Sequence, residues 1–306
     1  MNSDIIIALL AAAVQSGTPI LYATLGEIFT ERSGVLNLGV EGIMITGALS
    51  GFLVAKFTGN PLLAFFIAGL AGSCAASLHG LVCLVFQGNQ VVSGLALTIL
   101  GLGFADYFGT PFIGMSAPGF MTLEVPFLSA IPVVGAIFFK QDLLVYFTYI
   151  IPFLMWVFFF YSRYGLSLRA AGEYPAAVTA AGLNVVAYRW LGILVGGFFM
   201  GLGGAYLSLA YTHLWTSNLT AGRGWIAVAL VIFAFWKPGR AVFGAYLFGG
   251  VMALQLRLQA SGTPIPSSLL LMLPYVLTVG VLVFSSWWRG KTDEPAALGA
   301  NIEPAE

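Results

Sequence analysis

The chain alternates between long apolar stretches and short polar breaks. A helix needs about 20 apolar residues to cross the hydrocarbon core of a membrane, and most of the apolar stretches reach that length. The pattern predicts an all-α polytopic membrane protein with about nine transmembrane helices, at residues 4–25, 35–55, 61–86, 91–112, 143–161, 188–211, 223–236, 240–258 and 268–287. The seventh segment is short and follows a Gly-Arg-Gly sequence, which is typical of a half-helix. Residues 1–290 are therefore predicted to form one transmembrane domain, and residues 291–306 a polar, disordered cytoplasmic tail.

One polar stretch, residues 162–189, lies between two apolar segments. It carries four charged residues in a chain that is only 8% charged, namely Arg163, Arg169, Glu173 and Arg189. Pro175 suits the first turn of a helix, because its missing N–H would have no partner there. Gly182 suits the position after a helix end, since it adopts the left-handed conformation without a Cβ clash. We predict a short surface helix of small residues between them, which is either a docking element for a partner's groove or part of a plain connecting loop.

Composition agrees with a membrane protein. A soluble domain is about half apolar and a quarter charged, whereas this chain is 59% hydrophobic with a mean hydropathy of +0.95. The net charge of zero gives no reason to expect nucleic acid as a partner. Cys74 and Cys83 would point to nearly opposite faces of a helix, which disfavours both a disulfide and a metal site. Two interleaved G-x-x-x-G pairs in the segment 188–211 predict close helix packing.

The positions of Lys and Arg predict the orientation in the membrane, because basic residues favour the cytoplasmic side. If residues 162–189 are cytoplasmic, eight basic residues lie inside and four outside. The inside set is Arg32, Arg163, Arg169, Arg189, Lys237, Arg240, Arg289 and Lys291, and the outside set is Lys56, Lys140, Arg223 and Arg257. This topology places the N-terminus outside and the C-terminus in the cytoplasm. The N-terminus also lacks the basic region of a signal peptide, so we interpret it as the first span.

Polar residues inside apolar segments are costly and usually face a cavity or a partner. Asn37 and Glu41 open the second segment four residues apart, so on a helix they would share a face. The glycines around them are typical of broken helices that line cavities. The pair either lines a solute path or forms an internal hydrogen bond that locks two helices together. Glu27 and Glu31, with Arg32, are predicted to form a solvated face at the inner boundary.

A second polar cluster opens the fourth segment, with Asn89, Gln90 and Ser93. Its amides suit binding to hydroxyls or to the edge of a base. Alternatively they cap the start of a helix, which is the better interpretation for Asn89. His79, late in the third segment, is expected to be buried and hydrogen-bonded.

Three motifs resemble the permease subunits of ATP-driven importers of the branched-chain amino acid, simple-sugar and nucleoside group. Residues 31–44 are similar to that family's E-R-x-G-V-x-N-x-G-x-E-G-x-M signature. Residues 89–94 are similar to its N-E-V-I-S-G motif, with Gln90 in place of the acidic residue. Residues 169–182 resemble its cytoplasmic coupling helix, which docks into the ATPase, and match it at Arg169, Ala170, Gly172, Pro175, Ala176, Ala177 and Gly182.

The resemblance implies a permease that works by alternating access in a bacterial inner membrane. Its implied partners are a second homologous permease in a heterodimer, a cytoplasmic ABC ATPase that holds ATP and Mg²⁺, and an extracytoplasmic solute-binding protein. No catalytic residue, metal site or cofactor is expected in this chain. The expected path residues are Asn37, Glu41, Asn89, Gln90 and Ser93. The expected coupling residues are Arg169, Gly172, Glu173, Pro175, Ala176, Ala177, Ala180 and Gly182.

Two other classes compete with this interpretation. An ion-coupled secondary transporter of a small polar solute would show inverted repeats and mid-membrane carboxylates, and no clear repeat is present. An intramembrane enzyme would need a paired nucleophile and base, and no such motif is found. Residues 290–292 match the end of a phosphate-binding loop, but Ser285 stands where that loop requires glycine.

The expected solute is a nucleoside or a related simple sugar. Neutral amides and apolar spans suit such a solute, and no basic cluster in mid-membrane is available to pair with a carboxylate. The alternative is that the amides are structural and that the binding protein alone sets specificity.

Overall fold

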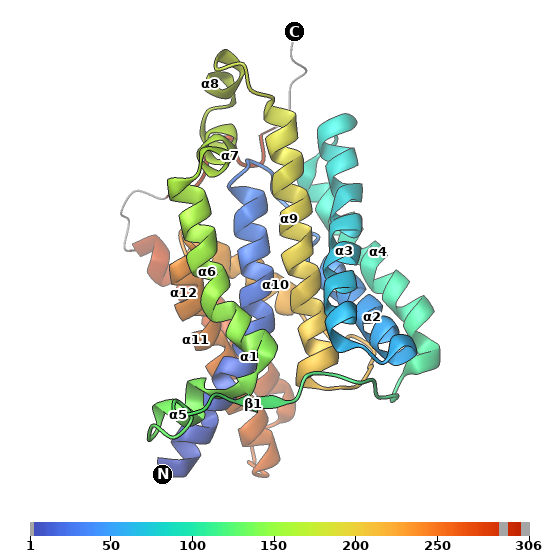
Figure 1. Ribbon diagram of the computed structural model, residues 1–306, viewed down its shortest axis with the longest axis vertical. Coiled ribbons are helices and arrows are strands. Elements are labelled where there is room, and N and C mark those ends of the chain that lie inside the picture. Colours follow the sequence, from blue (N-terminus) through green and yellow to red (C-terminus); the bar gives the residue numbers. More distant parts are fainter. Residues whose placement is uncertain (1–2, 288–292, 301–306) are drawn as a thin grey trace.

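The computed structural model describes residues 3–287 and 293–300, and most of this chain is helical (Figure 1). Two short strands, β1 (Thr122–Glu124) and β2 (Lys140–Asp142), form an antiparallel pair. The helices are α1 (Ser3–Glu31), α2 (Val40–Thr58), α3 (Pro61–Gly80), α4 (Gln90–Gly109), α5 (Val134–Phe138), α6 (Leu143–Tyr161), α7 (Arg163–Glu173), α8 (Pro175–Ala180), α9 (Val185–Tyr206), α10 (Arg223–Phe233), α11 (Pro238–Ala260) and α12 (Ser267–Trp287). Short π-helical turns extend α3 over Leu81–Val85 and α9 over Leu207–Tyr211, and a 3₁₀ turn over Thr110–Phe112 follows α4.

Seven helices of the described chain are long and apolar enough to cross a membrane, so the protein is a polytopic membrane protein. They are Asp4–Glu31, Val40–Thr58, Pro61–Val85, Gln90–Phe112, Leu143–Tyr161, Val185–Tyr211 and Pro238–Ala260. Two shorter apolar stretches, Arg223–Phe233 and Ser267–Val281, occupy the predicted seventh and ninth segments. The count of nine full spans is therefore not confirmed, whereas the short seventh helix is.

The bundle has two distinct ends (Figure 1). Helices α7 and α8 lie at one end, which we call the α7–α8 end. The chain's N-terminus, α5 and β1 lie at the opposite end, which we call the α5 end. The β1–β2 pair at the α5 end is a small departure from the predicted all-α fold. It forms because the Pro-rich connection before α6 runs antiparallel to itself, with Leu123 opposite Gln141.

Glycines bring α9 into backbone contact with three other helices. A Cβ added to Gly204 would lie 1.8 Å from the Met44 carbonyl oxygen of α2. The Gly192/Gly196 pair faces α1 and the Gly197/Gly201 pair faces α3; added Cβ atoms would meet side chains or carbonyls there. The two G-x-x-x-G pairs thus serve helix packing, as the sequence predicted. This packing places α9 in the centre of the bundle beside α1 and α2 (Figure 1).

Helix α10 is a half-helix that begins inside the bundle. Its 11 residues span about 16 Å, roughly half the hydrocarbon thickness of a membrane. Beyond its last turn, Trp236 donates through Nε1 to Glu31 in the last turn of α1, at the α7–α8 end, and Arg32 Nε donates to the Trp236 carbonyl at 3.2 Å. Its first turn therefore lies about halfway across the bundle. There an added Cβ on Gly224 would lie 2.5 Å from the Glu41 backbone nitrogen, so the first turns of α2 and α10 meet.

Local signals determine the ends of α8. Pro175 is its first residue, as predicted. Gly182 has a φ of +75°, its N–H donates to Thr179 O at 2.9 Å, and the Leu183 N–H donates to Val178 O at 3.0 Å. These two bonds form a Schellman motif with Gly182 at the position after the cap. The predicted short helix between Pro175 and Gly182 is therefore confirmed.

The chain near its C-terminus is ordered where it is described. Residues 293–300 lie against the α7–α8 end, and the Ala297 N–H donates to Gly172 O at 2.8 Å. Pro295 is buried, and Leu298 packs against the hydrophobic core. The prediction of a disordered tail is therefore wrong for these residues, because backbone bonds and an apolar contact hold them. Residues 290–292, considered above for phosphate binding, lie outside the described residues, as do Arg289 and 301–306.

Candidate functional site

A non-helical segment, residues 34–39, connects α1 to α2 inside the α7–α8 half of the bundle. We call it the crossing segment. Side chains from α3 and α4 satisfy its backbone, as a buried non-helical chain requires. Leu36 N donates to Gln90 Oε1 at 2.7 Å, His79 Nε2 lies 3.0 Å from Leu36 O, and Thr98 Oγ1 donates to Leu38 O at 2.9 Å. The polar residues of α3 and α4 therefore position this segment.

Asn37 lies in the crossing segment and not on α2, so the helical face predicted for Asn37 and Glu41 is wrong. The glycines that flank Asn37 keep the backbone out of the helix until Val40. The Asn37 N–H donates to Glu27 Oε1 at 3.2 Å, and its Oδ1 accepts from Gly39 N at 2.8 Å. Asn37 Nδ2 and Glu27 Oε2 are buried without a hydrogen-bond partner in the described chain. An unpaired amide at this depth is costly, so the Asn37 side chain keeps an unused hydrogen-bond donor in the described chain.

Glu41 caps the half-helix α10. Its Oε1 accepts from Gly222 N at 2.8 Å and from the Thr220 hydroxyl, and its Oε2 accepts from Gly224 N at 2.6 Å. Glu41 is buried, with 3% of its surface exposed. A carboxylate suits this place because the N-terminus of a helix carries partial positive charge and free N–H donors. The structure thus gives Glu41 the helix-locking bond that the sequence left as one of two alternatives.

The acidic residues in the last turns of α1 are buried, so the predicted solvated face is wrong. Glu27 and Glu31 are 0% and 2% exposed, because α10 and the crossing segment cover them. Arg32 is also buried and lies 3.6 Å from Glu173, through Nη1 and Oε1. Burial lowers the pKa of Arg32, and the nearby Asp293 and Glu173 carboxylates act in the opposite direction. Arg223, which belongs to the predicted outside set, is buried as well and donates to Leu219 O and Thr220 O.

A cavity of about 540 Å³ opens between α3 and α4. Its polar lining residues are His79, Asn89 and Ser93, and the remainder of the lining is apolar. Ser93 Oγ lies 3.0 Å from His79 Nδ1, so this histidine is buried and hydrogen-bonded as expected. Asn89 caps α4 by accepting from Val92 N at 3.0 Å, which confirms the capping interpretation. Gln90 does not line this cavity, and both of its amide atoms bond within the chain.

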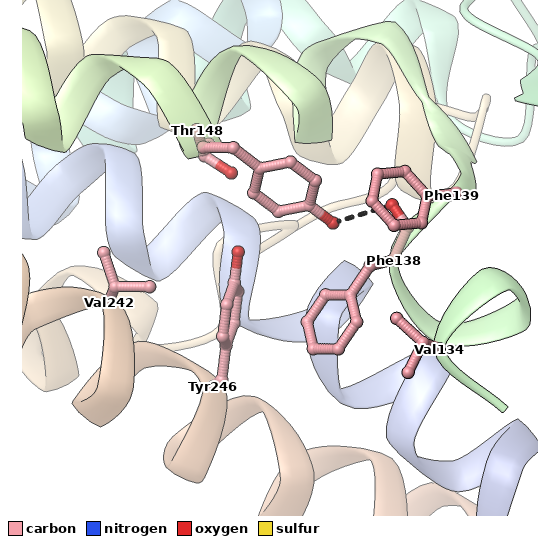
Figure 2. A pocket seen from close by; sticks show the side chains of 7 residues that line it. Val134, Phe138, Phe139, Thr148, Val242 and Tyr246 are labelled. Atoms are coloured by element: carbon pink, nitrogen blue, oxygen red, sulfur yellow. Dashed lines mark hydrogen bonds between the residues drawn. The ribbon is translucent and has the colours of Figure 1, made fainter. Parts of the chain in front are cut away.

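A second cavity, of about 390 Å³, lies near the α5 end between α5, α6 and α11 (Figure 2). Figure 2 shows the hydroxyls of Thr148 and Tyr246 facing each other across it. The dashed bond joins Tyr149 OH, as donor, to Phe138 O at 3.1 Å. Sequence patterns did not indicate this cavity, because its lining residues come from three separate helices.

The loop 162–189 presents small side chains outward. Ala176, Ala177 and Ala180 on α8 are exposed, whereas Val178 is 2% exposed and anchors the helix. Gly172 is buried against Arg32 O, and Glu173 faces Arg32 and residue 296. Arg169 donates through Nε to Phe159 O at 3.0 Å and stacks on Phe160. The predicted coupling residues thus divide into an outward set on α8 and an inward set at the end of α7.

A family model for the permease component of branched-chain amino acid transport systems matches residues 9–282. The chain belongs to this permease family. The putative glucose ABC transporter permease TsgC13 of Haloferax volcanii is 44% identical over 82% of this chain and 78% of its own length. The guanosine permease NupQ of Bacillus subtilis is 33% identical over 97% of this chain and 96% of its own. The nucleoside permease NupC of Lactococcus lactis is 34% identical over 93% of each. No solved structure matched.

This permease is therefore the membrane-spanning subunit of an ABC importer. It is not an enzyme, since ATP hydrolysis in this family takes place on a separate ATPase subunit. Family membership favours the ABC permease over the ion-coupled secondary transporter considered from the sequence.

Proposed function

We propose that this permease carries a nucleoside, or a related simple sugar, into the cytoplasm by alternating access. The observation that carries the proposal is the similarity to NupQ and NupC, named for guanosine and nucleosides, over 97% and 93% of this chain. TsgC13, named for glucose, is more identical over a shorter region. Nucleosides and glucose are both neutral and hydroxylated, which fits a chain without a basic cluster in its apolar spans.

The cavity between α3 and α4 supports a transport path on this face. Its volume of about 540 Å³ lies within the usual range for small-molecule sites. Its few neutral polar groups, Asn89, Ser93 and His79, suit a solute that must be released as readily as it is bound. A second homologous permease, most simply in a heterodimer, would close the open side. Asn37 and Gln90 lie at the inner end of this path, and Glu41 holds its wall by locking α2 to α10.

The exposed face of α8 supports docking to a cytoplasmic ABC ATPase that carries ATP and Mg²⁺. Its alanines leave room for a partner's groove, and Val178 fixes the helix to the rest of the loop. A binding protein would deliver the solute at the α5 end. In this arrangement movement of the ATPase against α8 opens and closes the path.

We expect the α7–α8 end to face the cytoplasm and the α5 end to face outward. The described basic residues of the inside set, Arg32, Arg163, Arg169, Arg189, Lys237 and Arg240, lie toward the α7–α8 end, and basic residues favour the cytoplasmic side. A cysteine at exposed Ala177 should then resist an impermeant thiol reagent in intact cells, while one at exposed Ala130 reacts. Cys74 and Cys83 are first replaced by alanine. If the cysteine at Ala177 reacts in intact cells and the one at Ala130 does not, the expected topology is wrong and the α7–α8 end faces outward.

The assembled importer should take up labelled uridine or adenosine in an ATP-dependent manner. Free ribose should compete poorly, because it lacks the base. Asn37→Leu should reduce the maximal rate more than the apparent affinity, since a separate protein captures the solute first. Uptake is measured in proteoliposomes with ATP inside, and glucose and leucine serve as competitors. Uptake of glucose or leucine that no nucleoside inhibits would overturn the solute assignment and leave the permease assignment unchanged.

A further inference from the structure

Residues 293–300 cross the α7–α8 end of the bundle and contact four separate parts of the chain. We call them the C-terminal strap. Asp293 forms an ion pair with Lys237 at the start of α11, and its carbonyl accepts from Arg32 Nη1 at 3.4 Å. The hydrogen bond from Lys237 lowers the pKa of Asp293, so the ion pair is present at neutral pH.

The middle of the strap is bound to the loop that contains α8. Ala297 N donates to Gly172 O at 2.8 Å, and Ala296 N donates to Glu173 Oε2 at 3.3 Å. Glu173 also pairs with Arg32. The strap is therefore bonded to the last residues of α7. The Glu173 carboxylate contacts both the strap and Arg32.

The end of the strap is bound to α4 and, through it, to the crossing segment. Gln90 Nε2 donates to Ala300 O at 2.9 Å, while Gln90 Oε1 accepts from Leu36 N at 2.7 Å. One amide side chain thus joins the strap to the segment that contains Asn37. Glutamine supplies both a donor and an acceptor, whereas an ionised glutamate has only acceptors.

These contacts form a continuous connection from α7 through the strap and Gln90 to the crossing segment. We propose that the C-terminal strap is a coupling element that transmits movement of the α7–α8 loop to the inner end of the transport path. The inference rests on the proposed docking of the ATPase on α8. It adds a connection through the C-terminal strap, with Gln90 at the start of α4 as the positioning residue at its end.

A pair of truncated chains tests the strap in the complete importer. One chain ends at Thr292 and lacks the strap, and its matched control ends at Ala300 and keeps it. Both are reconstituted with the partner permease, the ATPase and the binding protein. Uridine uptake and phosphate release are measured in the same proteoliposomes. Without the strap, the uridine transported per ATP hydrolysed should fall by about fivefold, the factor that corresponds to losing the hydrogen bond from Gln90 to Ala300, of typical net strength, that links the strap to the path. The chain that ends at Ala300 should match the full chain.

Gln90→Glu provides an independent point test. The new carboxylate still accepts from Leu36 N but loses the donor to Ala300 O and repels that carbonyl. It should lower the transport-to-hydrolysis ratio in the full chain, and should have no further effect in the chain that ends at Thr292. Such non-additivity indicates that the two sites act through one interaction.

The opposing results are distinct from a failure of the proposed function. If the chain that ends at Thr292 transports as much uridine per ATP hydrolysed as the full chain, the strap is not a coupling element. An equal loss of transport and of hydrolysis leads to the same conclusion. If the full complex does not transport uridine, the solute assignment fails, and the same chains are compared by the ATP hydrolysis that the binding protein stimulates. If Ala177→Trp leaves transport intact, docking on α8 fails, whatever the truncated chains show.

Discussion

Replacing Ala177 with tryptophan is expected to reduce transport by about tenfold or more, since overfilling a packed contact costs about 1–3 kcal/mol. Ala177 is exposed in this chain, so the bulky side chain clashes with no neighbour inside the permease. Val178 remains buried and keeps α8 in place. The loss should therefore arise at the contact with the ATPase. ATP-dependent uptake is measured in vesicles that contain the assembled importer.

Ala177→Ser is the matched control, because it adds one small polar atom and should transport normally. The amount of each variant in the membrane is measured alongside uptake, and the Trp variant should insert as well as the parent. Ala180→Trp should resemble Ala177→Trp, since both residues lie on the exposed face of α8. If both Trp variants transport at the parent rate, α8 is only part of a connecting loop.

Glu41→Leu is expected to destabilise the permease by on the order of 3 kcal/mol or more, because two buried donors and one partly buried donor lose a carboxylate acceptor. These donors are the Thr220 hydroxyl and the backbone N–H groups of Gly222 and Gly224. Leucine is similar in size, so the effect reports lost hydrogen bonds and not a cavity. Thermal unfolding of the purified permease in detergent measures the change, and transport should fall with it.

Glu124→Leu is the matched control for this substitution. Glu124 pairs with Lys140 at 3.2 Å, but its side chain is 61% exposed. An exposed ion pair contributes about 0–1 kcal/mol, so this variant should unfold close to the parent temperature. Equal stability of Glu41→Leu and Glu124→Leu would show that the cap on α10 does not hold the fold together.

Much of the helical framework could be predicted from the sequence, since its signals are local. A run of about 20 apolar residues is stable in a membrane only as a helix that satisfies its own backbone. Pro175, Gly182 and Asn89 were assigned correctly because a cap depends on donors and acceptors three to five residues away. The family motifs in residues 31–44, 89–94 and 169–182 are likewise continuous stretches.

Less of the candidate site than of the helical framework could be predicted, because the hydrogen bonds of the site join residues that are far apart in the chain. The argument that Asn37 and Glu41 share a face assumed one helix across both residues, and the crossing segment breaks that helix. Glu27 and Glu31 have the spacing of a solvated face, but α10 and the crossing segment bury them. The bonds from Trp236, Thr220 and Gly224 to buried carboxylates could not be predicted, since nothing in the neighbouring sequence marks these residues as partners of Glu31 and Glu41.

The sequence by itself determined the membrane class, the positions of most helices and the short helix α8, because each follows from residues close together in the chain. Only the tertiary structure decided that Glu41 caps α10, through a bond that spans 183 positions, and that Gln90 joins the strap, through one that spans 210. A buried polar group takes whichever partner the folded chain brings within about 3 Å. That partner is set by the packing of α1, α2, α4 and α10, which no single stretch of sequence encodes.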